Sequence, residues 1–490
     1  MNRSVQQVRR QGADGATVAS FVLAGALVLA AACTSESDGP KTAEQAERAE
    51  QIVRVYRGAT LVDGTGAGPI EDAVIVVRGD RIEALGQAGE VELPEGDMVQ
   101  TFDGMWIVPG LIDAHVHFSQ TGWFDGRPDA LDLRQYHPYE EVSARLAASP
   151  ELFSEAYLCS GVTSVFDVGG YPWTVALEER GDTDSRFVRV AATGPLLSTI
   201  DFWLNLPDEN QFAFMADSAA VREAVRENAD LGASAIKIWY IVPPQAPEDT
   251  ARMQDLVHLA AAEAAARDLP LVVHATGLWE AKDAIRAGAR VLVHGVFDGE
   301  VDEEFLTLAR EADVVYTPTI TVTEGYRNVF AQVGTDGLPY PAGCADEGTR
   351  NLLDSEIPSE WVPPGDMLTR YGEFVEKNAA IGMQNLRLVH EAGITVALGT
   401  DAGNPGTLHG PSFHYEAEVF QDAGFTPLEV LISATRNAAR AMGRGSELGT
   451  IEPGKLADFV ILRADPLTDA VNLREVARVV KGGRMVWPLE

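Results

Sequence analysis

The chain has 490 residues, and 46% of them are hydrophobic, so it can bury a large core and its length allows two or three domains. It carries 73 acidic and 38 basic residues, and the resulting net charge of -35 repels phosphate backbones, which excludes nucleic acid as an expected partner. The three cysteines are too few for a metal site made of cysteine, and Cys159 and Cys344 either pair or stay free.

Residues 1–32 have the layout of a secretory signal. Basic residues precede an apolar run over 18–32, which is shorter than the roughly 20 apolar residues of a membrane span. The small residues before Cys33 resemble a bacterial lipoprotein cleavage box, although Ala30 stands where that box usually has leucine. We expect an exported protein of the cell envelope, anchored by a lipid on Cys33 and a flexible acidic tether over 33–51. An ordinary signal peptide and an uncleaved anchor are the alternatives.

Residues 52–105 and 449–490 both consist of short strand-like runs separated by turn signals. They predict one small β-sandwich domain built from both termini, in which Gly482-Gly483 forms a hairpin turn. The expected strands are 53–56, 73–77, 81–84, 458–462, 476–481 and 484–487.

Residues 106–448 alternate short apolar runs with helical segments, a pattern typical of β/α units around a parallel sheet. The runs number eight, which predicts a (β/α)8 TIM-like barrel within the α/β class. An open doubly wound sheet is the alternative, but no glycine-rich phosphate loop follows the first strand. The expected strands are 106–117, 162–168, 188–194, 235–240, 269–274, 291–296, 314–319 and 395–401. The expected helices include 216–229, 250–267, 281–287, 302–311, 378–392 and 427–443.

Three long segments, 118–139, 197–214 and 324–365, follow strands on the side where such barrels keep their active sites, and they show no helical pattern. Their aromatic side chains are costly to leave in water, so we expect packed lids around a substrate site rather than disordered insertions. These aromatic residues are Trp123, Phe124, Phe202, Trp203, Phe212 and Phe214.

His115 and His117 lie two residues apart at the end of the first barrel strand. A strand has a period of two, so both imidazoles point the same way. Neutral imidazoles on one face form half of a transition-metal site, and zinc is a common occupant. A chance pair of surface or core histidines is the alternative.

Three further polar residues end apolar runs of the barrel: His274 ends the fifth, His294 the sixth and Asp401 the eighth. The carboxyl ends of barrel strands meet at one rim, so these side chains are expected to converge with the two histidines of the first strand. Four of the nine histidines of the chain are thus assigned to this rim, which chance placement explains poorly.

Lys237 lies inside the fourth apolar strand and is one of only six lysines, against thirty-two arginines. A lone buried ammonium is strongly disfavoured. The amine fits if it loses its proton and adds CO2 to form a carbamate that bridges two metals, because burial lowers a lysine pKa easily. A lysine that snorkels from the strand end or pairs with a buried acid is the alternative.

These six residues, in this order, resemble the ligand set of the amidohydrolase superfamily of metal-dependent hydrolases. The resemblance covers residues 52–488 and includes 449–458, which is similar to the segment by which that family re-enters its small β domain. Within the superfamily the chain resembles the imidazolonepropionase-related and Xaa-Pro dipeptidase-like branch. Imidazolonepropionases hold one metal and lack the bridging lysine, so Lys237 points to the two-metal, dipeptidase-like members.

The resemblance implies a role for each residue. The two histidines of the first strand and Asp401 would hold the more buried of two divalent metal ions, with zinc as the expected metal. The histidines of the fifth and sixth strands would hold the second ion, and carboxylated Lys237 would bridge the pair. A hydroxide between the metals would attack the carbonyl, and Asp401 would carry its proton to the leaving group.

Two residues outside the ligand set are candidates for contact with a small-molecule substrate. Tyr240, at the end of the fourth strand, either contacts the substrate or only packs. His409 follows Asp401 closely in the sequence, and it either lines the mouth of the site or makes hydrogen bonds within its loop.

The sequence supports three hypotheses about function. It is also compatible with a homo-oligomer. The first is a binuclear hydrolase of amide bonds in small molecules, with a dipeptide ending in proline as one candidate substrate. The second is the same site acting on an ester, a lactone or a phosphotriester. The third is a surface lipoprotein that keeps the fold as a non-catalytic binding module.

Overall fold

The computed structural model describes residues 52–94, 98–125, 132–201, 205–206, 209–242, 249–356 and 364–488. The expected signal, the lipid-bearing Cys33 and the acidic tether lie outside these residues, as do Phe202 and Trp203. Within the described part of the chain, no helix is long and apolar enough to cross a membrane.

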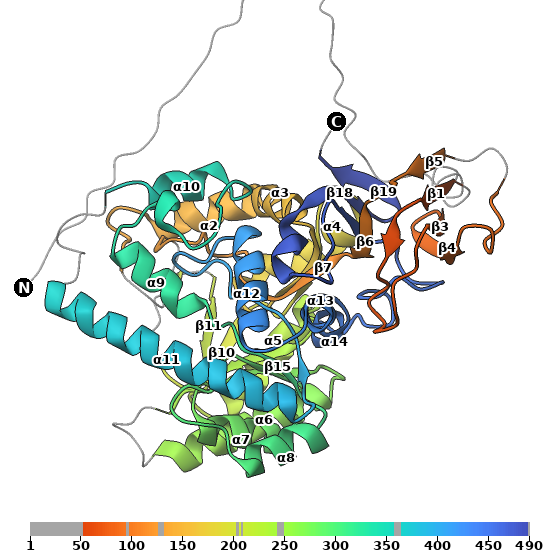
Figure 1. Ribbon diagram of the computed structural model, residues 1–490. Coiled ribbons are helices and arrows are strands. Elements are labelled where there is room, and N and C mark those ends of the chain that lie inside the picture. The colour runs from red at the N-terminus through yellow and green to blue at the C-terminus, as the bar shows by residue number, and fades with distance from the viewer. Residues whose placement is uncertain are drawn as a thin grey trace, which may run out of the picture. The chain divides into compact units, whose positions relative to one another are not determined.

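Two small sheets combine strands from both ends of the chain. One has the order β4-β3-β1-β5, and the other has the order β19-β18-β17-β6-β2. Strand β6 pairs antiparallel with β17, so the red N-terminal and dark blue C-terminal strands meet on one side of the molecule (Figure 1). These strands are β1 (Val53–Arg57), β2 (Thr60–Leu61), β3 (Ala73–Arg78), β4 (Arg81–Gln87), β5 (Met98–Thr101), β6 (Trp106–Pro109), β17 (Phe459–Leu462), β18 (Val476–Lys481) and β19 (Arg484–Trp487).

The expected first barrel strand, 106–117, is divided at Gly110. Residues 106–109 form β6 in the small sheet, and only Leu111–Val116 (β7) belongs to the barrel. Gly110 donates a backbone hydrogen bond to Asp458 of the small sheet, whereas Leu111 donates to Gly161 of the barrel. A Cβ at Gly110 would overlap the side chain of Thr163, so only glycine fits where the chain changes sheet.

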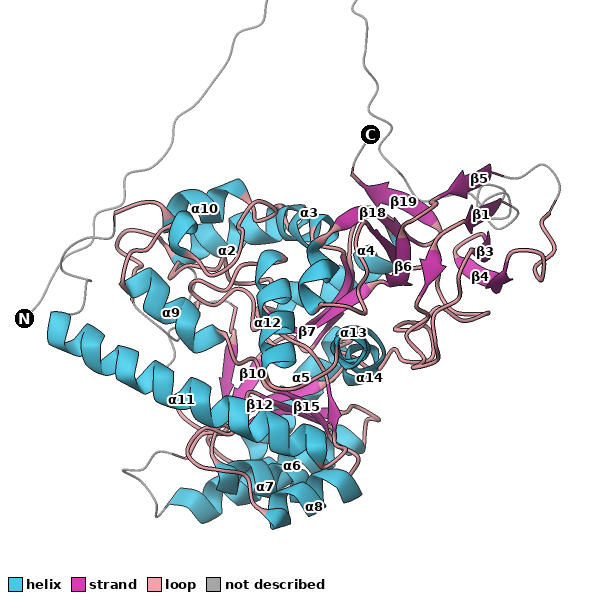
Figure 2. Cartoon of the chain, in the orientation of Figure 1, coloured by secondary structure: helices cyan, strands magenta, loops and turns pink. Residues whose placement is uncertain are grey.

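The barrel strands are parallel and are surrounded by helices, which confirms the predicted TIM-barrel-like α/β fold (Figure 2). Their order is β7-β8-β9 in one sheet and β11-β10-β12-β13-β14-β15-β16 in the other. Backbone hydrogen bonds from Ser234 to Ala192 and from Ala114 to Leu398 link the two sheets at both junctions. The remaining strands are β8 (Val162–Asp167), β9 (Arg189–Ala192), β10 (Leu196–Ser198), β11 (Phe212–Phe214), β12 (Ile236–Trp239), β13 (Leu271–His274), β14 (Val291–Val293), β15 (Val315–Thr317) and β16 (Thr395–Val396).

The helices begin and end at recognisable sequence signals. In α5, for example, Asp217 accepts hydrogen bonds from the backbone N–H groups of Ala219 and Ala220, and Gly232 ends the helix with a φ of 86°. The α-helices are α2 (Tyr139–Ala148), α3 (Glu151–Cys159), α4 (Leu177–Thr183), α5 (Ser218–Leu231), α6 (Thr250–Ala265), α7 (Leu278–Ala287), α8 (Glu303–Glu311), α9 (Val322–Phe330), α10 (Glu347–Leu353), α11 (Gly365–Glu391), α12 (Pro411–Asp422), α13 (Pro427–Ile432) and α14 (Ala438–Ala441). A π-helical turn over Ser433–Asn437 connects the last two, and 3-10 turns occupy Pro172–Ala176, Thr335–Gly337 and Ala470–Arg474.

The expectation that segment 324–365 contains no helix was wrong. It holds most of α9 and all of α10, and α11 begins at Gly365 instead of at 378. The N-terminal half of α11 is largely exposed, so its sequence lacks the apolar stripe that reveals a packed helix. The segment packs through Tyr340 and Leu353 against the buried Trp123 and Phe124 of the first lid. A disulfide between Cys159 and Cys344 ties it to α3.

The buried ion pair between Arg189 in β9 and Asp458 before β17 joins the barrel to the small sheet. Two hydrogen bonds of 2.6 and 3.2 Å connect the guanidinium and the carboxylate. Both side chains are at most 5% exposed. We expect Asp458→Asn to lower the free energy of unfolding by about 3–5 kcal/mol, because it removes the buried one of the two carboxylates that pair with Arg189 and leaves only the half-exposed Asp182.

Chemical denaturation of the two proteins measures this difference. Glu83→Gln is the matched control, because Glu83 pairs with Arg78 on the surface, where both side chains are more than 40% exposed. This change is expected to cost less than about 1 kcal/mol. Equal losses for both variants would contradict the assigned role of the buried pair.

Candidate metal centre

The predicted metal ligands gather at the carboxyl ends of the barrel strands. His115 and His117 leave β7 on the same side, and their Nε2 atoms lie 3.3 Å apart. Asp401, five residues beyond β16, places Oδ1 at 3.2 Å from Nε2 of His115 and at 2.9 Å from Nε2 of His117. The backbone N–H of Asp401 also donates to the His115 carbonyl. The first and last barrel strands therefore bring these three side chains together.

The histidines of the fifth and sixth strands complete the group. The ring centroids of His274 and His294 are 4.4 Å apart, and those of His115 and His294 are 4.8 Å apart. One ligand atom each from His115, His294 and Asp401 lies within 4.8 Å of the others, a spacing that could hold a metal ion. His115 thus borders both His117 and His294, and the division of the ligands between two ions stays a prediction.

Lys237 lies on β12 beside β13 and is fully buried. Its Nζ has no hydrogen-bond partner among the described residues, and neither has Nδ1 of His274. Burial lowers the pKa of Lys237 to about 7 and the pKa values of His115 and His274 to about 3. Neutral nitrogens that are buried without partners carry unused lone pairs, so the donor set fits divalent metal ions.

Hydrogen bonds from neighbouring elements orient the ligands, and the sequence reading missed these partners. Nδ1 of His117 lies 2.6 Å from the Gly169 carbonyl. Nδ1 therefore carries the proton, and Nε2 carries the lone pair that could bind a metal. Nδ1 of His294 lies 2.8 Å from the Thr319 hydroxyl. Thr319 ends an apolar run as the ligands do, so its position was the available signal.

Three residues at this rim adopt left-handed backbone conformations that residues other than glycine rarely adopt. The φ angles are 70° for His294, 47° for Thr319 and 65° for Asp401. Each such conformation costs roughly 1–3 kcal/mol and persists only where the surrounding structure imposes it. Three of the seven described non-glycine residues with positive φ therefore lie at the rim that carries the predicted ligands.

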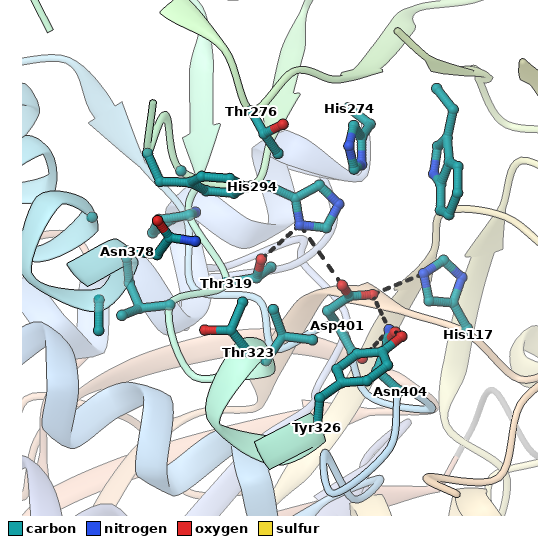
Figure 3. A pocket seen from close by; sticks show the side chains of 18 of the residues that line it. His117, His274, Thr276, His294, Thr319, Thr323, Tyr326, Asn378, Asp401 and Asn404 are labelled. Atoms are coloured by element: carbon teal, nitrogen blue, oxygen red, sulfur yellow. Dashed lines mark hydrogen bonds and ion pairs between the residues drawn. The ribbon is translucent and has the colours of Figure 1, made fainter. Parts of the chain in front are cut away.

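Asp401 is also held by a chain of hydrogen bonds from the α9 segment. Nδ2 of Asn404 donates to Oδ1 of Asp401 at 2.6 Å, and the hydroxyl of Tyr326 donates to Oδ1 of Asn404 at 2.8 Å. The phenol thereby directs the amide nitrogen of Asn404 toward the carboxylate (Figure 3). Sequence reasoning missed both residues, because Tyr326 lies 78 positions away from its partner.

The rim group borders a cavity of about 240 Å³. His117, His274, His294 and Asp401 line one side of it (Figure 3). The other walls come from the end of β12, from the segments after β13, β14 and β15, and from α9 and α11, and they include Trp239, Thr276, Phe297, Ile320, Val322, Thr323, Tyr326, Asn378, Ala379 and Gly382. A small molecule in this cavity would lie directly against the predicted ligands.

The two residues predicted to contact the substrate do not line this cavity. The hydroxyl of Tyr240 donates to Oδ2 of Asp283 at 2.8 Å. The ring of His409 stacks on Phe153 with centroids 3.8 Å apart, and its Nε2 lies 3.1 Å from the His117 carbonyl. Both side chains are buried in these contacts, so the geometry supports a packing role for each.

Comparison with known proteins identifies the family. The model of the amidohydrolase family matches residues 106–486. The chain belongs to this family. An imidazolonepropionase of Rhizorhabdus wittichii is 29% identical over 453 residues, covering 84% of this chain and 93% of the relative. An ochratoxinase of Aspergillus niger is 26% identical over 469 residues, covering 89% and 86%.

A solved structure supports the same fold. A crystal structure of a Xaa-Pro dipeptidase with bound methionine in the active site has a TM-score of 0.68 at 23% identity, and the match covers 88% of this chain and 99% of that one. Amidohydrolases typically bind divalent metals, and this chain is a metal-dependent hydrolase that acts on C–N bonds. The predicted superfamily and the prediction of an enzyme are confirmed.

The chain from Tyr326 through Asn404 to Asp401 leads to a prediction. Tyr326→Phe removes the hydroxyl that orients the Asn404 amide, and we expect kcat to fall by about 10- to 100-fold, as for other partners of metal ligands. KM should change much less, because the aromatic ring stays in the cavity wall. Steady-state kinetics of the purified variant measure both constants.

Tyr415→Phe is the control for this experiment. Tyr415 is also partly buried, but its hydroxyl donates to Glu324 rather than to a residue at the rim. Its loss should leave kcat within about twofold of the original, because this hydroxyl is not part of the hydrogen-bond chain that ends at Asp401. Similar decreases in both variants would show that the Tyr326 hydroxyl has no special role at the rim.

Proposed function

We propose that the protein is a binuclear amidohydrolase that cleaves an amide bond in a small molecule. The observation that carries the proposal is the buried, unpartnered amine of Lys237 beside the four rim histidines and Asp401. A buried ammonium here would have the carboxylates of Asp401 and Asp167 nearby but no hydrogen bond to either of them among the described residues. The same amine in a metal-bridging form would have two cations beside it.

Lys237 would supply the metal-binding group by reaction of its amine with CO2. The neutral amine, available because burial lowers its pKa to about 7, attacks the carbon of CO2 and releases one proton. The N–C bond that forms gives a carbamate with two oxygens. Lysine is the suitable side chain because its long stem reaches the rim from inside β12 while its backbone stays in the sheet.

Two divalent ions held by these side chains, with zinc as the proposed metal, would activate a water molecule and polarise the scissile carbonyl. Asp401 is the proposed base, because its carboxylate lines the cavity and is fixed by Asn404. It takes the proton of the attacking water and gives it to the leaving amine. The apolar cavity wall excludes other water from the reacting carbonyl.

We also propose that the protein is exported and anchored through a lipid on Cys33. The support is the signal-like layout of residues 1–32 together with the disulfide between Cys159 and Cys344. Disulfides persist mainly in oxidising compartments. Mass spectrometry of the protein purified from membranes would identify a lipidated Cys33, and an unmodified N-terminus would contradict the anchor.

Metal analysis tests the role of Lys237. The original protein should hold about two metal ions per chain, and Lys237→Met should hold at most one and lose about 1,000-fold or more in kcat, because metal catalysis contributes several kcal/mol. Thermal unfolding checks that the variant is folded, since methionine fits the volume of the lysine stem. Two bound ions in Lys237→Met would contradict the bridge.

Substrate profiling tests the reaction. We expect the metal-loaded protein to hydrolyse members of a panel of dipeptides, including Xaa-Pro, and N-acyl amides, and to lose this activity when a chelator removes the metal. The panel includes esters, lactones and a phosphotriester, which require the same polarised centre. Turnover of those compounds without any amide turnover would overturn the proposed amide specificity.

A further inference from the structure

One wall of the cavity carries a buried polar group that the chemistry at the rim does not use. Asn378 lies on α11, lines the cavity, and is only 7% exposed. Its Nδ2 has no hydrogen-bond acceptor among the described residues. In Figure 3 the side chain extends from α11 toward the space beside His294. A buried donor without an acceptor costs free energy, so its retention points to a ligand that accepts from it.

Asn385, also on α11, shows what a structural asparagine looks like in this fold. Its Oδ1 accepts from the Val301 N–H, and its Nδ2 donates to the carbonyls of Val296 and Gly299. Both asparagines are buried on the same helix, but only Asn385 has its amide group satisfied by the backbone. Asn385 therefore holds α11 in place, whereas Asn378 is directed at the cavity.

The chemistry of the cavity wall indicates which acceptor fits. Apart from the rim histidines and Asp401, every described residue that lines the cavity is uncharged. Gly382, one turn beyond Asn378, allows Ile320 to approach α11, because a Cβ there would meet its side chain at 3.0 Å. Trp239, Phe297 and Val322 add further apolar surface. A neutral carbonyl oxygen matches one N–H donor here, whereas a carboxylate would leave its charge uncompensated.

We propose that Asn378 is a specificity-determining residue, and that the substituent of the substrate amide that lies against α11 is uncharged, apolar or aromatic, and presents a carbonyl-type acceptor to its Nδ2. This inference rests on the proposed function of the same site. It places the recognition of the substituent on α11, across the cavity from the rim residues that carry the reaction.

The test compares binding of acetophenone and cumene to the full-length, metal-loaded protein. The two molecules are nearly the same size, but acetophenone has a carbonyl oxygen where cumene has a methyl group. The dose-dependent rise of the unfolding temperature gives each dissociation constant. We expect the affinity for acetophenone relative to cumene to be about tenfold higher in the original protein than in Asn378→Ala, because a hydrogen bond to a buried donor is worth about that factor.

Unfolding temperatures without ligand provide a second readout. Asn378→Ala should unfold at the same or a higher temperature than the original protein, because it removes an unpartnered buried donor, whereas Asn385→Ala should unfold at a clearly lower one. The same acetophenone-to-cumene affinity ratio in both proteins, or a loss of stability in Asn378→Ala that equals that of Asn385→Ala, would overturn the proposal. Discrimination between the probes without turnover of any amide would overturn the proposed reaction and leave the role of Asn378 standing.

Discussion

A single buried carboxylate, that of Asp113, fixes the relative positions of the first and last barrel strands. It accepts hydrogen bonds from the backbone N–H and the hydroxyl of Thr400 at 3.0 and 2.7 Å, and from the backbone N–H of His115 at 3.2 Å. Burial raises the pKa of Asp113 to about 7, and these donors partly offset that effect. His115 and Asp401 therefore lie next to each other because the Asp113 side chain adds three hydrogen bonds to the direct backbone bond between them.

The six rim residues could be predicted from the sequence because each obeys a local rule. His115, His274, His294 and Asp401 end apolar runs, and the carboxyl ends of parallel strands converge in any such barrel. Lys237 was recognisable because a lysine inside an apolar strand conflicts with its surroundings. Their assignment as metal ligands still stays a prediction.

The supporting residues could not be predicted, because their roles depend on contacts between distant segments. Asp113 and Asn404 look like ordinary polar residues until their partners across the fold are known. The separation of β6 from β7 depends on which sheet each backbone group makes its hydrogen bonds with. The apolar residues of the run do not predict this partner. For Tyr240 and His409 the sequence left substrate contact and packing both open, and in the structure their side chains make packing contacts and do not line the cavity.

The pairing of β6 with β17 determines when the small sheet can form during synthesis of the chain. Synthesis starts at the N-terminus, so β6 is made long before β17. The two strands lie about 350 positions apart, with the whole barrel between them. The edge of β6 must therefore stay unpaired until synthesis is nearly finished. Loss of the last few dozen residues would leave that edge open even in a chain whose barrel and catalytic rim are intact.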